Sequence, residues 1–219
     1  MTNPPITQEV AAKVLEVVDA GLCSGVGVPE PGKMCVEAAV CYALGLPHGD
    51  NPSCVAPALR SLKIRLNDSG WSSNEARAKG LRRLALIQLG SAGYLDEGEF
   101  RRRVVDLAIR YSIPFALRAA ASICKLPQKK AEMLAAAIKC EKEGTRESAL
   151  EARRAAAAAY AAAYAAASAA AAYDAAAAAS AAAREATDKS LADYAESVIQ
   201  ILIDMKAPGC QWLSLTEVA

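Results

Sequence analysis

The sequence is dominated by one alanine tract, in which residues 155–183 read AAAAAYAAAYAAASAAAAYDAAAAASAAA. Alanine fills 23 of these 29 positions, and alanine has the highest helix propensity of any residue. We therefore predict one long helix over residues 149–186. Small side chains let neighbouring helices approach closely, because interaxial distance depends on the side chains at the contact. The tract predicts a central helix that is packed on several sides.

The tyrosines of the tract allow a second interpretation. On a helix Tyr160 and Tyr164 lie about 40° apart, and Tyr173 lies on nearly the opposite side. A tyrosine face of this kind is typical of a binding surface or of a seam between subunits in a homo-oligomer. Tyrosines on a core helix equally place their hydroxyls at its polar rims. The sequence leaves both interpretations open.

Outward from the tract, the chain reads as further helices separated by Gly and Pro. Each segment shows apolar residues at helical spacing, and several begin with a capping residue, such as Thr7 or the pair Ser72 and Glu75. No stretch alternates polar and apolar residues for long. We predict an all-α fold, a compact bundle of about eight helices. The expected segments are 7–20, 33–44, 53–67, 72–89, 96–124 with a kink or break at Pro114, 128–141, the alanine-rich helix, and 191–206 capped by Asp188 or Ser190.

Composition divides the chain into two parts. Residues 1–93 are punctuated by Gly and Pro and contain short helices, whereas residues 94–219 contain the long helices and the alanine tract. The break at Gly90–Gly93 is too short for a flexible linker. We therefore expect the two modules to share one core.

Charge and cysteine content indicate the class of protein and the cellular compartment. The 219 residues carry 25 Lys and Arg against 24 Asp and Glu, so the net charge of +1 does not indicate a general binder of nucleic acid or membrane. Seven cysteines are too few for a disulfide scaffold and are expected to be free thiols. The first residues show no secretory signal, and Asp174 opposes membrane insertion of the tract. We expect a cytoplasmic protein.

The segment Gly27–Lys33 matches G-x-x-x-x-G-K, the start of a phosphate-binding loop. Met34 stands where a metal-binding Ser or Thr is required, and two prolines remove N–H groups that would hold phosphate. The loop therefore does not predict nucleotide hydrolysis. A weaker hypothesis remains, in which Gly32 and Lys33 open a helix whose N-terminus attracts an anion.

The only histidine lies in the turn Leu46-Pro-His48-Gly-Asp50. His48 with Asp50 or a cysteine would form the catalytic site of a hydrolase, but a histidine in such a turn more often bonds nearby backbone. The same histidine belongs to a group of possible metal ligands, which are Cys23, Cys35, Cys41, His48 and Cys54. Because these residues form no C-x-x-C pair, we predict neither a metal nor a cofactor.

Basic residues are concentrated in residues 54–110, which hold 11 Lys and Arg against six Asp and Glu. Arg82 and Arg83 are adjacent, and Trp71 lies in a nearby loop. Such a surface would bind a nucleotide, a nucleic-acid backbone or an acidic protein, or would simply be the solvated faces of helices. No helix-turn-helix pattern indicates sequence-specific recognition of nucleic acid.

The segments Ile113-Pro-Phe-Ala-Leu-Arg-Ala-Ala-Ala and Lys139-Cys-Glu-Lys-Glu-Gly-Thr-Arg, followed by the alanine-rich residues 149–186, resemble the alanine-rich immunity proteins of bacterial polymorphic-toxin systems and phage genomes. The resemblance covers roughly residues 100–206. It implies an all-helical, non-enzymatic protein that binds and neutralises a partner. The N-terminal part lies outside the pattern, and no binding residue carries over.

Two functions follow as hypotheses. The first is a binding protein of immunity or anti-defence type, whose partner is a toxin or defence protein. The alternative is a protein that binds or sequesters a nucleotide-like small molecule through Gly32, Lys33, His48, Asp50, Trp71, Arg82 and Arg83.

Overall fold

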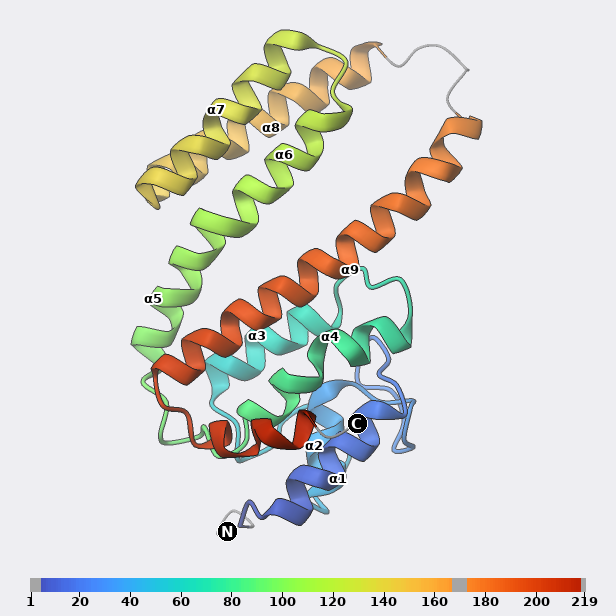
Figure 1. Ribbon diagram of the computed structural model, residues 1–219, viewed down its shortest axis with the longest axis vertical. Helices are drawn as coiled ribbons and strands as arrows, with labels where there is room; N and C mark the ends of the chain where they lie inside the picture. The colour runs from blue at the N-terminus through green and yellow to red at the C-terminus, as the bar shows by residue number, and fades with distance from the viewer. Residues whose placement is uncertain (1–4, 167–172, 218–219) are drawn as a thin grey trace. The chain divides into compact units, whose positions relative to one another are not determined.

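The computed structural model describes residues 5–166 and 173–217, with the side chains of residues 160, 163–166 and 173–186 left out. Within these residues there are nine α-helices and no strand, which confirms the predicted all-α class. The α-helices are α1 (Gln8–Asp19), α2 (Val36–Ala43), α3 (Pro57–Asn67), α4 (Asn74–Ile87), α5 (Glu97–Leu107), α6 (Ile113–Ile123), α7 (Pro127–Glu143), α8 (Arg146–Ala166) and α9 (Tyr173–Asp204) (Figure 1). A π-helical turn, η1 (Ala108–Ser112), and a 3₁₀ segment, η2 (Pro208–Thr216), complete them. No helix in the described part is long and apolar enough to cross a membrane.

The chain forms two compact units. Unit 1 combines Met1–Arg101 with Ser180–Ala219, and unit 2 is Arg102–Ala179. Composition predicts a boundary between residues 93 and 94, with the whole C-terminal part in one module. The two divisions differ because most of α9, from Ser180 onward, and η2 belong with the N-terminal helices.

Unit 1 has its core where α4 meets α1 and η2. Leu81 and Leu84 on α4 and Val14 and Val18 on α1 have no exposed surface. Gly209 brings η2 against α4, since a side chain at that position would overlap the carbonyl of Ile87. This close approach places the C-terminal segment in the core of the N-terminal helices.

Capping residues set the starts of the helices in unit 1. Thr7 accepts a hydrogen bond from Val10 N, as predicted. The cap of α4 is Ser73, which accepts from Ala76 N at 3.1 Å, and not Ser72 as predicted. Ser72 instead donates its backbone N–H and its hydroxyl to the carboxylate of Asp188. Asp188 was expected to cap a final helix, but it lies inside α9, which is continuous to Asp204.

The predicted break between the alanine-rich helix and a separate final helix is absent. Helix α8 is described over Arg146–Ala166, and α9 runs from Tyr173 through Ser190 to Asp204 without a break, because nothing between 186 and 191 disfavours a helix strongly. Residues 167–172 lie outside the described part of the chain. The side chains of Tyr160, Tyr164 and Tyr173 do so too, so the predicted tyrosine face is not described.

Unit 2 is built from α6, α7 and α8, and α7 packs against both of the others (Figure 1). Its core contains Leu117 of α6, Met133 and Cys140 of α7, and Ala152 of α8. Small residues dominate this core, as the alanine content predicts. Helix α7 ends at Gly144, whose φ of +63° is the left-handed conformation that glycine favours.

Pro114 does not break the predicted helix 96–124. The proline ring would clash with the carbonyl four residues earlier in an α-helix. The chain avoids this by widening to η1, where Ile113 N–H donates to Ala108 O, five residues back. The result is a continuous helical path from α5 into α6.

Candidate functional site

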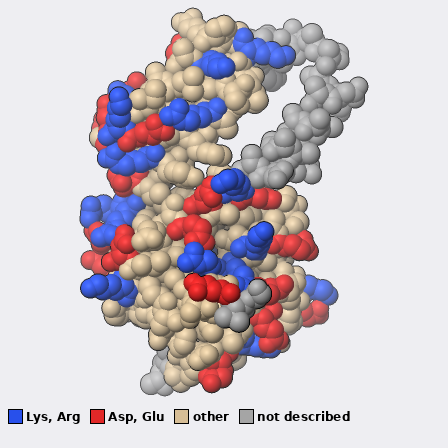
Figure 2. Space-filling view, viewed as in Figure 1, with Lys and Arg blue, Asp and Glu red and all other residues tan. Residues whose placement is uncertain are grey.

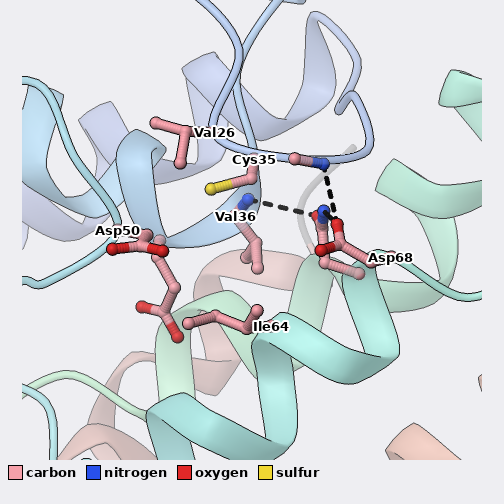
Figure 3. Close-up of a pocket in the computed structure, with 9 residues that line it drawn as sticks. Val26, Cys35, Val36, Asp50, Ile64 and Asp68 are labelled. Atoms are coloured by element: carbon pink, nitrogen blue, oxygen red, sulfur yellow. Dashed lines mark hydrogen bonds between the residues drawn. The ribbon is translucent and has the colours of Figure 1, made fainter.

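A cavity of about 60 Å³ lies in unit 1, at the start of α2. Three segments meet there: the glycine-rich loop before α2, the turn that carries Asp50, and the end of α3. In Figure 3 Asp50 and Asp68 lie on opposite sides, with Cys35 and Val36 between them and Ile64 below. The lining residues are Gly25, Val26, Cys35, Val36, Glu37, Asp50, Ile64, Asn67 and Asp68.

Asn67 and Asp68, at the end of α3, hold the loop in place. Asp68 Oδ1 accepts from Gly25 N at 2.8 Å and from Ser24 Oγ at 3.3 Å. Asn67 donates to Cys23 O and accepts from Val36 N. Burial acts to raise the pKa of Asp68, but the hydrogen bonds from Gly25, Asn67 and Ser24 outweigh it and lower the pKa. Asp68 is therefore ionised at neutral pH, and its Oδ1 accepts the hydrogen bonds that tie the loop to the end of α3.

Glu37 and Lys63 form a fully buried ion pair beside the cavity, with Lys63 Nζ 3.0 Å from Glu37 Oε1. Burial raises the pKa of Glu37, and the Lys63 ammonium opposes that rise. Burial lowers the pKa of Lys63, and Glu37 opposes that fall. Neither carboxylate oxygen of Glu37 accepts a hydrogen bond of normal geometry from the described residues. A charged group of this kind within a core is a candidate for function.

The cysteine thiols near this pair are protonated at neutral pH. Burial raises the pKa of Cys35 and of Cys54, and it raises the pKa of Cys41 to about 11. The thiolate is the nucleophile, so none of the three is activated. Across the described residues, no three His, Cys, Asp or Glu side chains gather closely enough to hold a metal ion.

The structure brings the His48 turn against the glycine-rich loop. His48 is exposed, and its Nε2 lies 3.0 Å from the backbone oxygen of Gly27. Asp50, two residues on, lines the cavity. Gly32 and Lys33 do not open a helix: α2 begins at Val36 with Cys35 as its cap, because residues 28–33 fold back in a turn closed by the Gly27–Met34 bridge. Lys33 pairs with Glu30 at 2.7 Å.

The other predicted site residues have partners within unit 1. Arg82 binds both oxygens of Asp19 and also donates to Thr216 O. Arg83 pairs with Glu196. Trp71 is buried, and its indole N–H donates to Leu66 O. Basic and acidic side chains intermingle on the face of unit 1 that Figure 2 shows.

Sequence reasoning missed Glu37 and Lys63. Lys63 was counted among the basic residues of a solvated surface, but it has no exposed surface at all. The available signal was local: Glu37 interrupts the apolar run Met34–Val40, in which every other residue is uncharged. A charge within such a run indicates a buried partner elsewhere in the chain.

A second candidate feature is α6 in unit 2. Its sequence, IPFALRAAASI, contains two polar residues, yet only Pro114, Leu117 and Ala121 are buried. Phe115, Ala119 and Ile123 are exposed at spacings of four residues, and Ile123 has 81% of its surface exposed. A helix that is apolar on nearly all sides is normally buried on most of them.

No protein family model, curated protein or solved structure matches this chain.

Proposed function

We propose that this protein is a non-enzymatic binding protein that neutralises a protein partner, of immunity or phage anti-defence type, and that α6 makes the contact. The observation that carries the proposal is the exposed apolar face of α6, defined by Phe115, Ala119 and Ile123. Exposed apolar surface of this kind marks sites of protein association. Of the segments that resemble alanine-rich immunity proteins, the first lies in α6, and all but residues 180–186 lie in unit 2.

The charge of unit 2 specifies the chemistry of the partner. Unit 2 holds 12 Lys and Arg against seven Asp and Glu, whereas unit 1 holds 13 against 17. Lys125, just after α6, and Lys130, in the first turn of α7, are exposed and pair with no acid among the described residues. The partner surface is therefore apolar at its centre and acidic at its rim, since complementary charge steers association and fixes register.

The experiment is co-purification followed by reconstitution. A partner that co-elutes with the tagged chain from its native cells is purified and titrated against the chain by calorimetry. Phe115→Asp and Ile123→Asp are expected to abolish binding, because each places a charge at the centre of the apolar contact. Tyr94→Asp is the matched control, since Tyr94 is 58% exposed but lies in unit 1.

Two results would overturn the proposal. In the first, the partner binds Ile123→Asp as tightly as the native chain. In the second, sedimentation shows a dimer that Ile123→Asp disperses, which assigns the α6 face to a second copy of the chain. Binding that weakens as salt is raised supports the acidic rim.

A further inference from the structure

A hollow of about 300 Å³ opens on unit 1 where α3 meets the first turns of α5. Its lining contains two guanidinium groups and no carboxylate, and both arginines are exposed to solvent. Ligand pockets in proteins measure roughly 300–1,000 Å³, so this hollow has room for one small organic molecule. The lining residues are Pro57, Ala58, Ser61, Leu62 and Arg65 of α3 and Arg101 of α5.

Arg65 brings a positive charge that no acid in the described part of the chain neutralises. Its guanidinium forms no ion pair with the described residues, although Asp68 follows only three residues later. Asp68 instead accepts hydrogen bonds from Gly25, Ser24 and Asn67. Because arginine does not lose its proton in proteins, Arg65 stays charged and is available to an anion from solution.

Arg101 keeps most of its donors while one acid holds it in place. Arg101 Nη2 donates to Glu97 Oε2 at 2.9 Å, and the same oxygen accepts from Ala58 N at 2.9 Å. A guanidinium has five N–H donors, so this contact uses one of them. Glu97 also occupies the N-terminal turn of α3, which leaves the two arginines, and not the end of the helix, to bind an anion.

The excess of basic residues over 54–110 predicted a surface that binds a nucleotide or another anion. Arg82 and Arg83, which were assigned to that surface, pair with Asp19 and Glu196. Arg65 and Arg101 belong to the same segment of sequence and line the hollow. The charge pattern of the sequence and the lining of the hollow therefore indicate the same class of ligand.

The donors and the apolar lining together define the ligand. A carboxylate presents two oxygens, which one guanidinium satisfies, whereas a phosphate monoester presents three and bonds two guanidinium groups at once. Pro57 and Leu62 provide apolar surface for the organic group. We propose that this hollow binds a small organic phosphate monoester whose phosphate contacts Arg65 and Arg101. The site is built from residues of unit 1 and does not depend on the proposed function.

The test is an NMR titration of the ¹⁵N-labelled full chain with phenyl phosphate at constant ionic strength. The backbone amides of Ala58, Leu62 and Arg101 are expected to shift and to saturate. Phenol, which has no anionic group, is expected to give no saturating shift. Inorganic phosphate lacks the organic group and benzoate lacks the third oxygen, so each is expected to bind about tenfold more weakly, which is about 1.4 kcal/mol.

Variants of exposed residues locate the site without disturbing the core. Arg65→Gln and Arg101→Gln each remove one charge and are each expected to weaken binding about tenfold. Ser61→Asp places a carboxylate in the hollow and is expected to abolish binding, whereas Ser61→Asn is expected to bind nearly as the native chain does. Lys79→Gln is the matched control, because Lys79 is exposed on α4 and does not line the hollow. It is expected to leave the affinity unchanged.

Three kinds of result would overturn the proposal. The first is shifts that never saturate, or an unchanged affinity in Arg65→Gln. The second is equal weakening by Lys79→Gln and Arg65→Gln, which would show a general attraction to positive charge and no site. The third is benzoate or inorganic phosphate that binds as tightly as phenyl phosphate, which would contradict the assignment to a phosphate monoester.

Discussion

Lys63 Nζ lies 3.0 Å from Glu37 Oε1, and neither side chain has any surface exposed to solvent. The two residues belong to different helices, α3 and α2, so the pair fixes how these helices lie against each other. Removing two charges from water costs several kcal/mol, and their attraction repays this only while both are present. The pair therefore makes unit 1 sensitive to loss of either partner.

Replacing one partner is predicted to be far more costly than replacing both. Lys63→Met should lower the free energy of unfolding by about 3–5 kcal/mol, because it leaves the Glu37 carboxylate buried and unpaired. The double variant Lys63→Met with Glu37→Leu should recover most of that loss. Urea unfolding of the native chain, the two single variants and the double variant measures the cycle. A single-variant loss below about 1 kcal/mol would contradict a buried ionised pair.

Alkaline pH is predicted to destabilise unit 1 through Cys41. Burial raises the pKa of Cys41 from 9.0 in the unfolded chain to about 11 in the folded one. The buried, protonated thiol therefore stabilises the folded state fully below pH 9.0. This stabilisation is lost as the pH rises to about 11, because between these values only the thiol of the unfolded chain ionises. At about 1.36 kcal/mol per pH unit, a rise in pKa from 9.0 to about 11 corresponds to roughly 3 kcal/mol.

Cys41→Ala isolates this contribution. The difference in unfolding free energy between the native chain and Cys41→Ala should shrink as pH rises from about 8 to about 11, since alanine cannot ionise. Groups that titrate identically in both proteins cancel from the difference. A difference that stays constant over this range would show that the Cys41 thiol is accessible to water.

Local sequence signals predicted the helices, and long-range pairing was beyond their reach. Thr7 caps α1 as expected because the bond it accepts comes from Val10, three residues away. Pro57 is likewise found in the first turn of α3, where its missing N–H costs nothing. In contrast, Asp188 is of a residue type that commonly caps helices, but it accepts hydrogen bonds from Ser72, which is distant in the chain.

In the candidate site, too, local features could be predicted from the sequence and long-range contacts could not. The turn that carries His48 was predicted from Pro and Gly, and the interpretation of His48 as a residue that bonds nearby backbone matches its contact with Gly27 O. The cavity could not be predicted, because Glu37, Asp50 and Asp68 come together only through packing of the loop, α2 and α3. Propensity and periodicity hold no information on which charged residue becomes buried.

Gly27 is predicted to tolerate substitution much less than Gly25, although both have positive φ, +73° and +68°. A Cβ at Gly27 would overlap the carbonyl oxygen of Lys33 across the turn, whereas a Cβ at Gly25 meets nothing within 4 Å. Gly25→Ala should cost only the left-handed penalty of about 1–2 kcal/mol. Gly27→Ala should cost clearly more and displace the loop from Asp68. Thermal unfolding of the two variants compares them, and equal losses would mean that backbone conformation alone sets the cost.

Arg110 is predicted to stabilise unit 2 by capping α7. Its guanidinium donates to the carbonyl oxygens of Glu141, Lys142 and Glu143, the last groups of a helix that otherwise lack partners. Arg110→Met keeps the apolar stem and should cost about 1–2 kcal/mol, because it removes charged donors from these carbonyls. Hydrogen exchange should quicken first at the C-terminal end of α7.

Arg118→Met is the matched control for the capping role. Arg118 also reaches Glu141, but it binds the exposed carboxylate and no backbone oxygen. Exposed ion pairs of this kind contribute about 0–1 kcal/mol, so this variant should unfold nearly as the native chain does. If Arg110→Met and Arg118→Met lowered the free energy of unfolding equally, Arg110 would stabilise unit 2 through its charge and not through its hydrogen bonds to the last carbonyl groups of α7. A loss of stability in Arg110→Met alone, with faster hydrogen exchange at residues 140–143, would show that Arg110 acts by capping α7.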